Sequence, residues 1–328
     1  MKLLSNHVLD EALNRTNLLR QQEQIYKCTE YLSPEYQRQL PIKLIGSRSL
    51  GSNCTSFMTS TWRDKICEWY YTIVDFFNYD REFVFVCMNY LDRYAMKRRV
   101  TVETYQLAAM TALFIVTKTY GSNSTGNTLD LSSLTKLSQS IFNANDILVM
   151  EGEMLQTLGW YLFPPTPFTF ANELLMFVKW TGKSNGRPRL SPDVLHEIRE
   201  LTRFLTELSV CDCFFITQDS STTGYACLLN AIETTTSEDE GKFPFELREE
   251  YMNAIYSQTG LDPLCPKVLE CRRRLRETFM LGGFQQYKQD LQEIQPASQT
   301  DSVDTPEADE KEPIAGIPSP VCVSGATT

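Results

Sequence analysis

Residues 88–94 read Met-Asn-Tyr-Leu-Asp-Arg-Tyr and close an apolar run, Phe-Val-Phe-Val-Cys-Met, at positions 83–88. The apolar run predicts a helix whose body lies in a protein core. Charged side chains are rarely buried unless they are paired. Asp92 and Arg93, at the end of this run, therefore need either solvent or a specific partner. The rest of the chain decides between these two interpretations.

The segments on either side of this run also have the pattern of helices. A helix that starts near residue 61 carries apolar residues three and four positions apart, which places them on one broad stripe. Thr59, Ser60 or Thr61 can cap its N-terminus. Asp80 can cap the next helix, which we expect over residues 81–95. The motif at 88–94 thus ends the second helix of a series.

The third helix of the series decides the architecture. We expect it over about residues 101–118, with Thr101 as its cap and Glu103 at the positive end of its dipole. Its interior is apolar nearly all round, as in the central helix of a bundle. Two further helices, over about 129–140 and 146–158, complete a group of five around this central one.

A proline-rich break follows, and then the helical pattern restarts. Residues 163–167 read Phe-Pro-Pro-Thr-Pro and cannot continue a helix. Alternation typical of strands does not persist anywhere. Five more helices are expected, near residues 167–180, 191–210, 220–236, 245–258 and 265–282.

These patterns predict an all-α protein with four parts. Residues 284–328 carry Pro, Ser, Thr, Asp and Glu with few large apolar residues, so we expect a disordered acidic tail there. The other parts are an N-terminal leader over residues 1–59, which contains a helix, a first five-helix unit over 60–163, and a second five-helix unit over 164–283.

Composition argues against several classes of protein. The chain has 328 residues and 42% hydrophobic residues, enough for a substantial core. It contains no run of 18 or more apolar residues, so we expect no membrane span. Asp10 and Glu11 interrupt the N-terminal segment, which argues against a secretory signal peptide. A formal charge of −10 without a basic patch argues against direct binding of nucleic acid.

The cysteines and histidines give no sign of a metal, cofactor or catalytic site. Ten cysteines are scattered, and only Cys211 and Cys213 lie close together, without a second Cys or His pair that would complete a zinc site. A reducing, intracellular setting is expected. His7 and His196 are the two histidines of the chain. No nucleophile and base stand in a pattern typical of an enzyme.

The five-helix pattern, with Tyr-Leu-Asp-Arg-Tyr at the end of its second helix, resembles the cyclin box. Residues 62–69 fit the register of the first cyclin helix, and Asn89 to Tyr94 match the end of the second. The resemblance is strong over residues 60–170 and extends over 170–285 as helix pattern and order. The residues that define the family's pattern also fall in register: Arg63, Asp92, Leu107, Lys118 and Glu151.

The resemblance implies a fold and a role for each of these residues. It implies two tandem five-helix cyclin folds, the second one degenerate. Arg63 and Asp92 would form a buried ion pair between the first two helices, and Leu107 would lie in the core. Lys118 and Glu151, each near a helix end and a loop, would pair and contact the kinase. The alternative for these two is an ordinary exposed ion pair, worth under about 1 kcal/mol.

The function that the resemblance implies is regulatory. The chain would be a non-catalytic cyclin that binds and activates a cyclin-dependent kinase in cell-cycle control, in the nucleus, the cytoplasm or both. One alternative is a cyclin of a transcriptional kinase. Another is a cyclin-fold transcription factor that bridges DNA and polymerase, but such proteins need a basic face and often a zinc ribbon.

A patch that docks substrates in cell-cycle cyclins also has counterparts here. Lys65 breaks the apolar series of this patch, and Thr72 stands where an acid usually receives the substrate's arginine. Docking of Arg-x-Leu motifs therefore stays open, with core packing of Ile66 and Trp69 as the alternative. The residues at the matching positions are Trp62, Ile66, Trp69 and Gln106.

Overall fold

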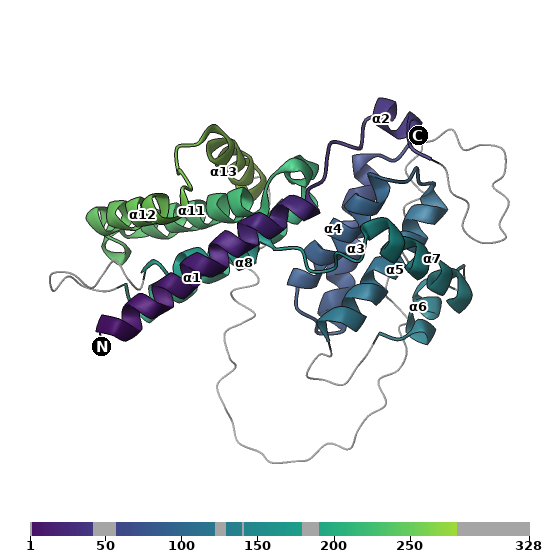
Figure 1. The fold of residues 1–328 in the computed structure, drawn as a ribbon, viewed down its shortest axis with the longest axis horizontal. Coiled ribbons are helices and arrows are strands. Elements are labelled where there is room, and N and C mark those ends of the chain that lie inside the picture. The colour runs from purple at the N-terminus through teal and green to yellow at the C-terminus, as the bar shows by residue number, and fades with distance from the viewer. Residues whose placement is uncertain (1, 42–56, 122–128, 140, 179–189, 281–328) are drawn as a thin grey trace, which may run out of the picture.

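The regular secondary-structure elements in the described part of the chain are all helices, which confirms the all-α prediction. Within it no strand is present. Figure 1 shows α3–α7 gathered on one side of the molecule, and α11–α13 on the other with α1 and α8. The acidic tail expected over 284–328 lies outside the described residues. The computed structural model describes residues 2–41, 57–121, 129–139, 141–178 and 190–280.

The first group of helices surrounds one central helix, as its apolar pattern predicted. Every residue of α5 from Tyr105 to Val116 is buried. This helix packs against α3, α4, α6 and α7. The members of the group are α3 (Ser60–Phe76), α4 (Glu82–Ala95), α5 (Val102–Tyr120), α6 (Leu131–Leu137) and α7 (Ala144–Leu158).

Local capping explains where several of these helices begin and end. The Thr101 hydroxyl accepts a hydrogen bond from the Thr104 amide at the start of α5. The Asn143 side chain accepts one from the Asp146 amide, and Asp146 returns one to the Asn143 amide, which forms a capping box for α7. Gly159 ends α7 with a φ of 66°, a left-handed conformation that suits glycine. α6 is shorter than the predicted 129–140.

The second group is built around α11. This helix packs against α8, α10 and α13. Gly224 on α11 permits a very close approach, because a Cβ atom there would lie 2.2 Å from the Pro167 carbonyl oxygen. α8 ends at Leu175, earlier than the predicted residue 180. The members are α8 (Pro167–Leu175), α10 (Pro192–Cys211), α11 (Ser220–Glu238), α12 (Phe245–Thr259) and α13 (Pro266–Thr278).

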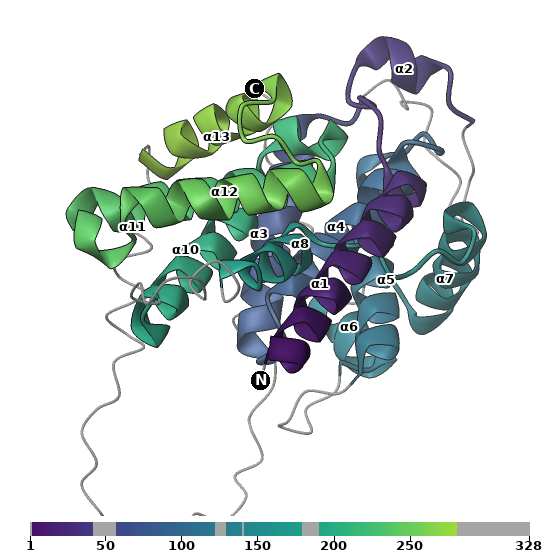
Figure 2. The ribbon, with the colours of Figure 1, turned by 60° about the vertical axis from the view of Figure 1, so that its left-hand side comes forward.

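The N-terminal helix lies against the second group. α1 (Lys2–Glu23) packs on α8 and α12, and Figures 1 and 2 show it beside α8. Arg15 bonds the Glu173 carboxylate at 3.0 Å, and Arg20 donates to the Thr259 carbonyl. The helix expected in the N-terminal leader is thus present, and it continues into η1 (Gln24–Tyr26).

Residues 27–38 lead from α1 to the first group. Tyr31 is buried in the first apolar cluster. Ser33 then caps α2 (Pro34–Arg38) by accepting a hydrogen bond from the Tyr36 amide. The N-terminal segment therefore contacts both groups of helices.

Candidate functional site

The end of α4 holds a buried ion pair. Nε and Nη2 of Arg63 on α3 donate to the two carboxylate oxygens of Asp92, each at 3.1 Å. The side chains are only 4% and 6% exposed. The Tyr31 hydroxyl donates to Asp92 Oδ1 at 2.7 Å, and Arg63 Nη1 donates to the Val210 carbonyl at 2.8 Å. Both charges are thus paired and hydrogen-bonded, as buried charges must be.

The electrostatics of this pair favour the charged state of Arg63. Burial alone lowers the pKa of Arg63, but the charge and hydrogen bonds of Asp92 raise that pKa well above its ordinary value. The structure therefore places Arg63 and Asp92 together as the resemblance implied, between the first two helices of the group. Leu107 is buried nearby in the same apolar cluster.

Arg93 is also buried, and its contacts were not predicted from the sequence. Its guanidinium donates to the carbonyls of Leu158 and Tyr161, each at 2.9 Å. These carbonyls lie at and just beyond the C-terminus of α7, where a cation also suits the helix dipole. The same guanidinium lies 4.9 Å from the centre of the Tyr26 ring. Both charged residues of the 88–94 motif, Asp92 and Arg93, are therefore paired with groups of the protein and not with solvent.

Lys118 and Glu151 form an ion pair on the surface of the first group. Lys118 Nζ lies 2.7 Å from Glu151 Oε1, with side chains 52% and 14% exposed. Lys118 is in the last turn of α5, but Glu151 lies in the middle of α7, so the expectation of a helix end was wrong for Glu151. Lys118 Nζ also lies 4.7 Å from the centre of the Phe114 ring.

Exposed apolar side chains lie on α7, at the end of α5 and in the segment after α7. Leu148 is 46% exposed and lies three residues before Glu151 on α7, hence on the same face. Tyr120 follows Lys118 and is 36% exposed, and its ring lies 5.4 Å from the ring of the exposed Phe163. Partly exposed charges beside apolar groups are typical of a protein interface. We call Lys118, Tyr120, Leu148, Glu151 and Phe163 the Lys118 surface.

The counterparts of the substrate-docking patch are mostly buried. Ile66, Trp69 and Gln106 lie in the interior, and only Trp62 is partly exposed, with its ring 6.4 Å from the ring of Tyr105. The apolar stripe of α3 faces the core because α4 and α5 pack against it. Three of the four residues are therefore closed to solvent, and their part in substrate docking stays a prediction.

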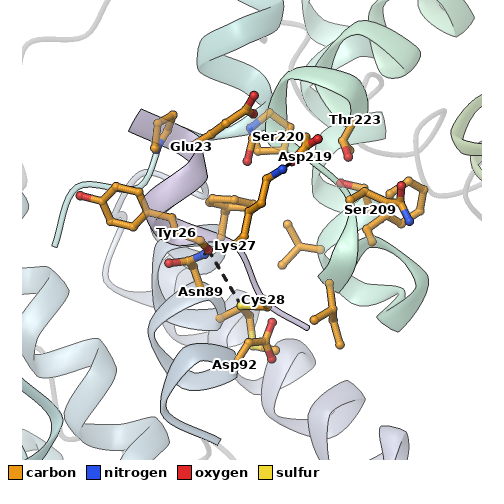
Figure 3. Close-up of a pocket in the computed structure, with 18 of the residues that line it drawn as sticks. Glu23, Tyr26, Lys27, Cys28, Asn89, Asp92, Ser209, Asp219, Ser220 and Thr223 are labelled. Carbon is orange, nitrogen blue, oxygen red and sulfur yellow. Dashed lines mark hydrogen bonds and ion pairs between the residues drawn. The ribbon is translucent and has the colours of Figure 1, made fainter. Parts of the chain in front are cut away.

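A small cavity of about 60 Å³ lies between the two groups of helices, where η1, α4 and the start of α11 meet. Figure 3 shows Lys27 pointing toward Asp219 across it, and Lys27 Nζ lies 2.6 Å from Asp219 Oδ1. Small-molecule sites are usually several times larger. No cluster among the described residues has the composition of a metal site, and no described helix is long and apolar enough to span a membrane. We interpret the cavity as a gap within the polar contact between the two groups of helices.

Glu23 beside this cavity should make stability depend on pH. Its carboxylate accepts hydrogen bonds from the amide and hydroxyl of Ser221, both at 2.8 Å. Burial raises the pKa of Glu23 above its ordinary 4.5, Ser221 and Arg20 lower it, Asp219 raises it, and the net shift is upward. A pKa raised in the folded state means that stability is lost as pH rises from 4.5 through the raised value.

Replacing Glu23 with glutamine should remove this pH dependence. We expect the free energy of unfolding of Glu23→Gln to gain on that of wild type as the pH rises, by about 1.4 kcal/mol for each unit of raised pKa. Urea unfolding at several pH values measures this difference. Glu35→Gln, at an exposed position on α2, is the matched control. Parallel pH profiles for wild type and Glu23→Gln would contradict the prediction.

Comparison with known proteins places this geometry in context. The family model described as "Cyclin, N-terminal domain" matches residues 33–163, a range that holds the Arg63–Asp92 and Lys118–Glu151 ion pairs. The G1/S-specific cyclin CCN1 of Candida albicans is 30% identical over 143 residues, which are 40% of this chain and 20% of that protein. The G2/mitotic-specific cyclin-3 of Saccharomyces cerevisiae is 25% identical over 214 residues, 65% of this chain and 44% of that protein.

The matched regions thus span less than half of each of these two curated relatives. A solved structure, that of a viral cyclin from herpesvirus saimiri, has a similar fold. It superposes with a TM-score of 0.55 at 17% identity, and the match covers 84% of this chain and 99% of that one.

Proposed function

This chain is a cyclin-box protein, and from that premise we propose that it binds and activates a cyclin-dependent protein kinase in cell-cycle control. The relatives with G1/S-specific and G2/mitotic-specific names support the cell-cycle setting over a transcriptional one. We expect the complex in the nucleus, the cytoplasm or both.

The observation that carries the proposal is the Lys118 surface. An ion pair held at 2.7 Å presents an ammonium group that can donate to backbone carbonyls and a carboxylate that can accept from backbone amides. Leu148 adds exposed apolar area on the same face of α7, and the Tyr120–Phe163 ring pair adds more at the end of α5. Such a surface suits a partner with free backbone groups at a helix end and an apolar face next to them.

The mechanism that we propose is a shift between kinase conformations. The Lys118 surface would pack on the regulatory helix of the kinase and hold that helix inward. The inward position completes the lysine–glutamate pair of the kinase and orders its activation loop. The chain contributes no reacting group in this mechanism. Its effect equals the difference between its affinities for the active and inactive kinase conformers.

Removing the ion pair tests the proposal. We expect the double variant Lys118→Ala, Glu151→Ala to capture at least about tenfold less kinase in affinity purification. Truncating a charged group that is desolvated at an interface costs about 2–5 kcal/mol of binding free energy. Phosphorylation of histone by the captured kinase should fall in parallel. Mass spectrometry of the captured proteins identifies the kinase and separates a cell-cycle kinase from a transcriptional one.

The control is an exposed ion pair on the second group, in which the arginine is as exposed as Lys118. Arg273 on α13 pairs with Glu270 at 2.6 Å, with side chains 53% and 46% exposed. Arg273→Ala with Glu270→Ala should leave kinase capture unchanged. Both double variants should melt close to wild type, since exposed pairs contribute under about 1 kcal/mol. Unchanged capture by the Lys118 and Glu151 variant would refute the contact model.

A further inference from the structure

Two cysteine thiols meet where the two groups of helices touch. Sγ of Cys67 on α3 lies 3.4 Å from Sγ of Cys211 at the end of α10, although the residues are 144 positions apart. Both are free thiols. Cys67 is fully buried, whereas Cys211 is partly exposed and hence open to a small solute. The pairing of these two residues is not visible in the sequence, where Cys211 stands beside Cys213.

The surrounding contacts hold the two sulfur atoms in place. The Tyr71 hydroxyl on α3 donates to the Glu207 carbonyl on α10 at 3.1 Å. Arg63 Nη1 donates to the carbonyl of Val210, the residue before Cys211, at 2.8 Å. The contact between α3 and α10 is thus fixed by hydrogen bonds one turn on either side of Cys67. These bonds hold the two sulfur atoms next to each other.

Their environment makes the two thiols unequal. A hydrogen bond from the Cys67 thiol lowers the pKa of Cys211, burial raises it, and the positive charge of Arg63 lowers it, with a net downward direction. The same hydrogen bond, together with burial, raises the pKa of Cys67. The thiolate is the reactive form of cysteine. Cys211 is therefore the member of the pair that ionises first and meets solvent.

The other described cysteines lack this combination. Cys87 and Cys227 are fully buried, and burial raises the pKa of each thiol. Burial also raises the pKa of Cys213, and the nearby charge of Asp212 acts in the same direction. The Cys67–Cys211 pair combines three properties: the two sulfur atoms face each other, Cys211 is partly exposed, and the pKa of Cys211 is lowered.

We propose that Cys67 and Cys211 form a redox-sensitive dithiol, which a hydroperoxide oxidises to a disulfide that joins α3 to α10. With hydrogen peroxide, the Cys211 thiolate attacks one peroxide oxygen, the O–O bond breaks, and hydroxide leaves and takes a proton to become water. Cys211 is then a sulfenic acid. The Cys67 sulfur attacks the Cys211 sulfur, the S–O bond breaks, and a second water leaves with the Cys67 proton. Two thiols and one peroxide thus yield one disulfide and two waters.

The geometry requires only a small movement. The sulfur atoms must approach from 3.4 Å to about 2.05 Å, which rotation of the two side chains and a slight shift of the end of α10 provide. The resulting disulfide closes a loop of more than a hundred residues that contains α4 to α8. Closure of a long loop restricts the unfolded chain and stabilises the folded one. Oxidation would therefore fasten the two groups of helices together.

Peptide mapping of the full-length chain tests the proposal. The reduced protein is treated with hydrogen peroxide, free thiols are alkylated, and the chain is digested without reductant for mass spectrometry. We expect a peptide pair linked through Cys67 and Cys211, which dithiothreitol separates. A disulfide from Cys211 to Cys213 or to any other cysteine, or sulfinic acid at Cys211 without a disulfide, would overturn the proposal, and so would absence of any product.

Thermal melting gives a second, independent readout. The oxidised wild type should melt at least about 5 °C above the reduced form, because a disulfide across a long loop is strongly stabilising. Cys67→Ser and Cys211→Ala should each abolish this difference, whereas Cys87→Ser should retain it as the matched control. An equal rise on oxidation in either variant of the pair would contradict the assignment. Since the mapping uses wild type, it stands even if a variant folds poorly.

Discussion

Replacing Asp92 with alanine is expected to lower the free energy of unfolding by about 3–5 kcal/mol. The change leaves the Arg63 guanidinium at 4% exposure without a counter-charge. It also removes the acceptor of the Tyr31 hydroxyl, which donates to Asp92 at 2.7 Å. A single buried cation is costly because neither water nor another carboxylate can reach it. Urea or guanidinium unfolding measures the loss.

An exposed pair where α3 leads into α4 supplies the control for this prediction. Asp75 at the end of α3 bonds Arg81 at 2.9 Å, with side chains 49% and 40% exposed. Asp75→Ala should cost under about 1 kcal/mol, since water replaces the lost partner. If Asp92→Ala costs no more than Asp75→Ala, the buried pair is not the structural tie that its geometry indicates.

Replacing Gly224 with alanine is the second substitution with a large expected effect. The new Cβ atom would lie 2.2 Å from the Pro167 carbonyl oxygen and 3.3 Å from Phe170 Cβ. The first of these atoms belongs to the backbone at the start of α8, so a side-chain rotation cannot relieve the clash. α11 and α8 must move apart, and overpacking of this kind costs about 2–3 kcal/mol. Thermal melting and urea unfolding should both report the loss.

Gly152 offers a matched glycine for comparison. It lies within α7, and a Cβ atom built there meets nothing within 4 Å. Gly152→Ala should therefore stabilise the chain by about 0.5–1 kcal/mol, because alanine costs less conformational entropy in a helix. The two substitutions add the same methyl group and should have opposite signs. A stable Gly224→Ala variant would mean that α8 and α11 tolerate a wider separation than the structure shows.

Helix positions were predictable because their signals are local. Thr101 and Asn143 cap the helices that their sequence neighbours predict, and Gly159 ends α7 in the left-handed conformation. The burial of α5 follows from its own composition. The pairing of Arg63 with Asp92 was expected from the resemblance to cyclins and not from spacing. Such a contact between helices has no local signal.

Contacts between distant segments could not be predicted for the same reason. Nothing near Tyr31 indicates that its hydroxyl will reach Asp92, and nothing near Arg93 points to the C-terminus of α7. The apolar stripe of α3 indicates that Ile66 and Trp69 turn inward, but it does not show which helices cover them. The position of α1 against the second group likewise depends on long-range packing.

The bond from Arg63 to the Val210 carbonyl joins residues 147 positions apart, and this affects the order in which the chain folds. A ribosome releases Arg63, Asp92 and the whole of α7 before it has made α10. During that interval the nascent first group lacks one acceptor for its buried guanidinium. This hydrogen-bond network can be completed only after the second group is synthesised. Contacts between residues so far apart in the sequence also form slowly. The first group should therefore be most vulnerable to proteases and chaperone binding while translation is still under way.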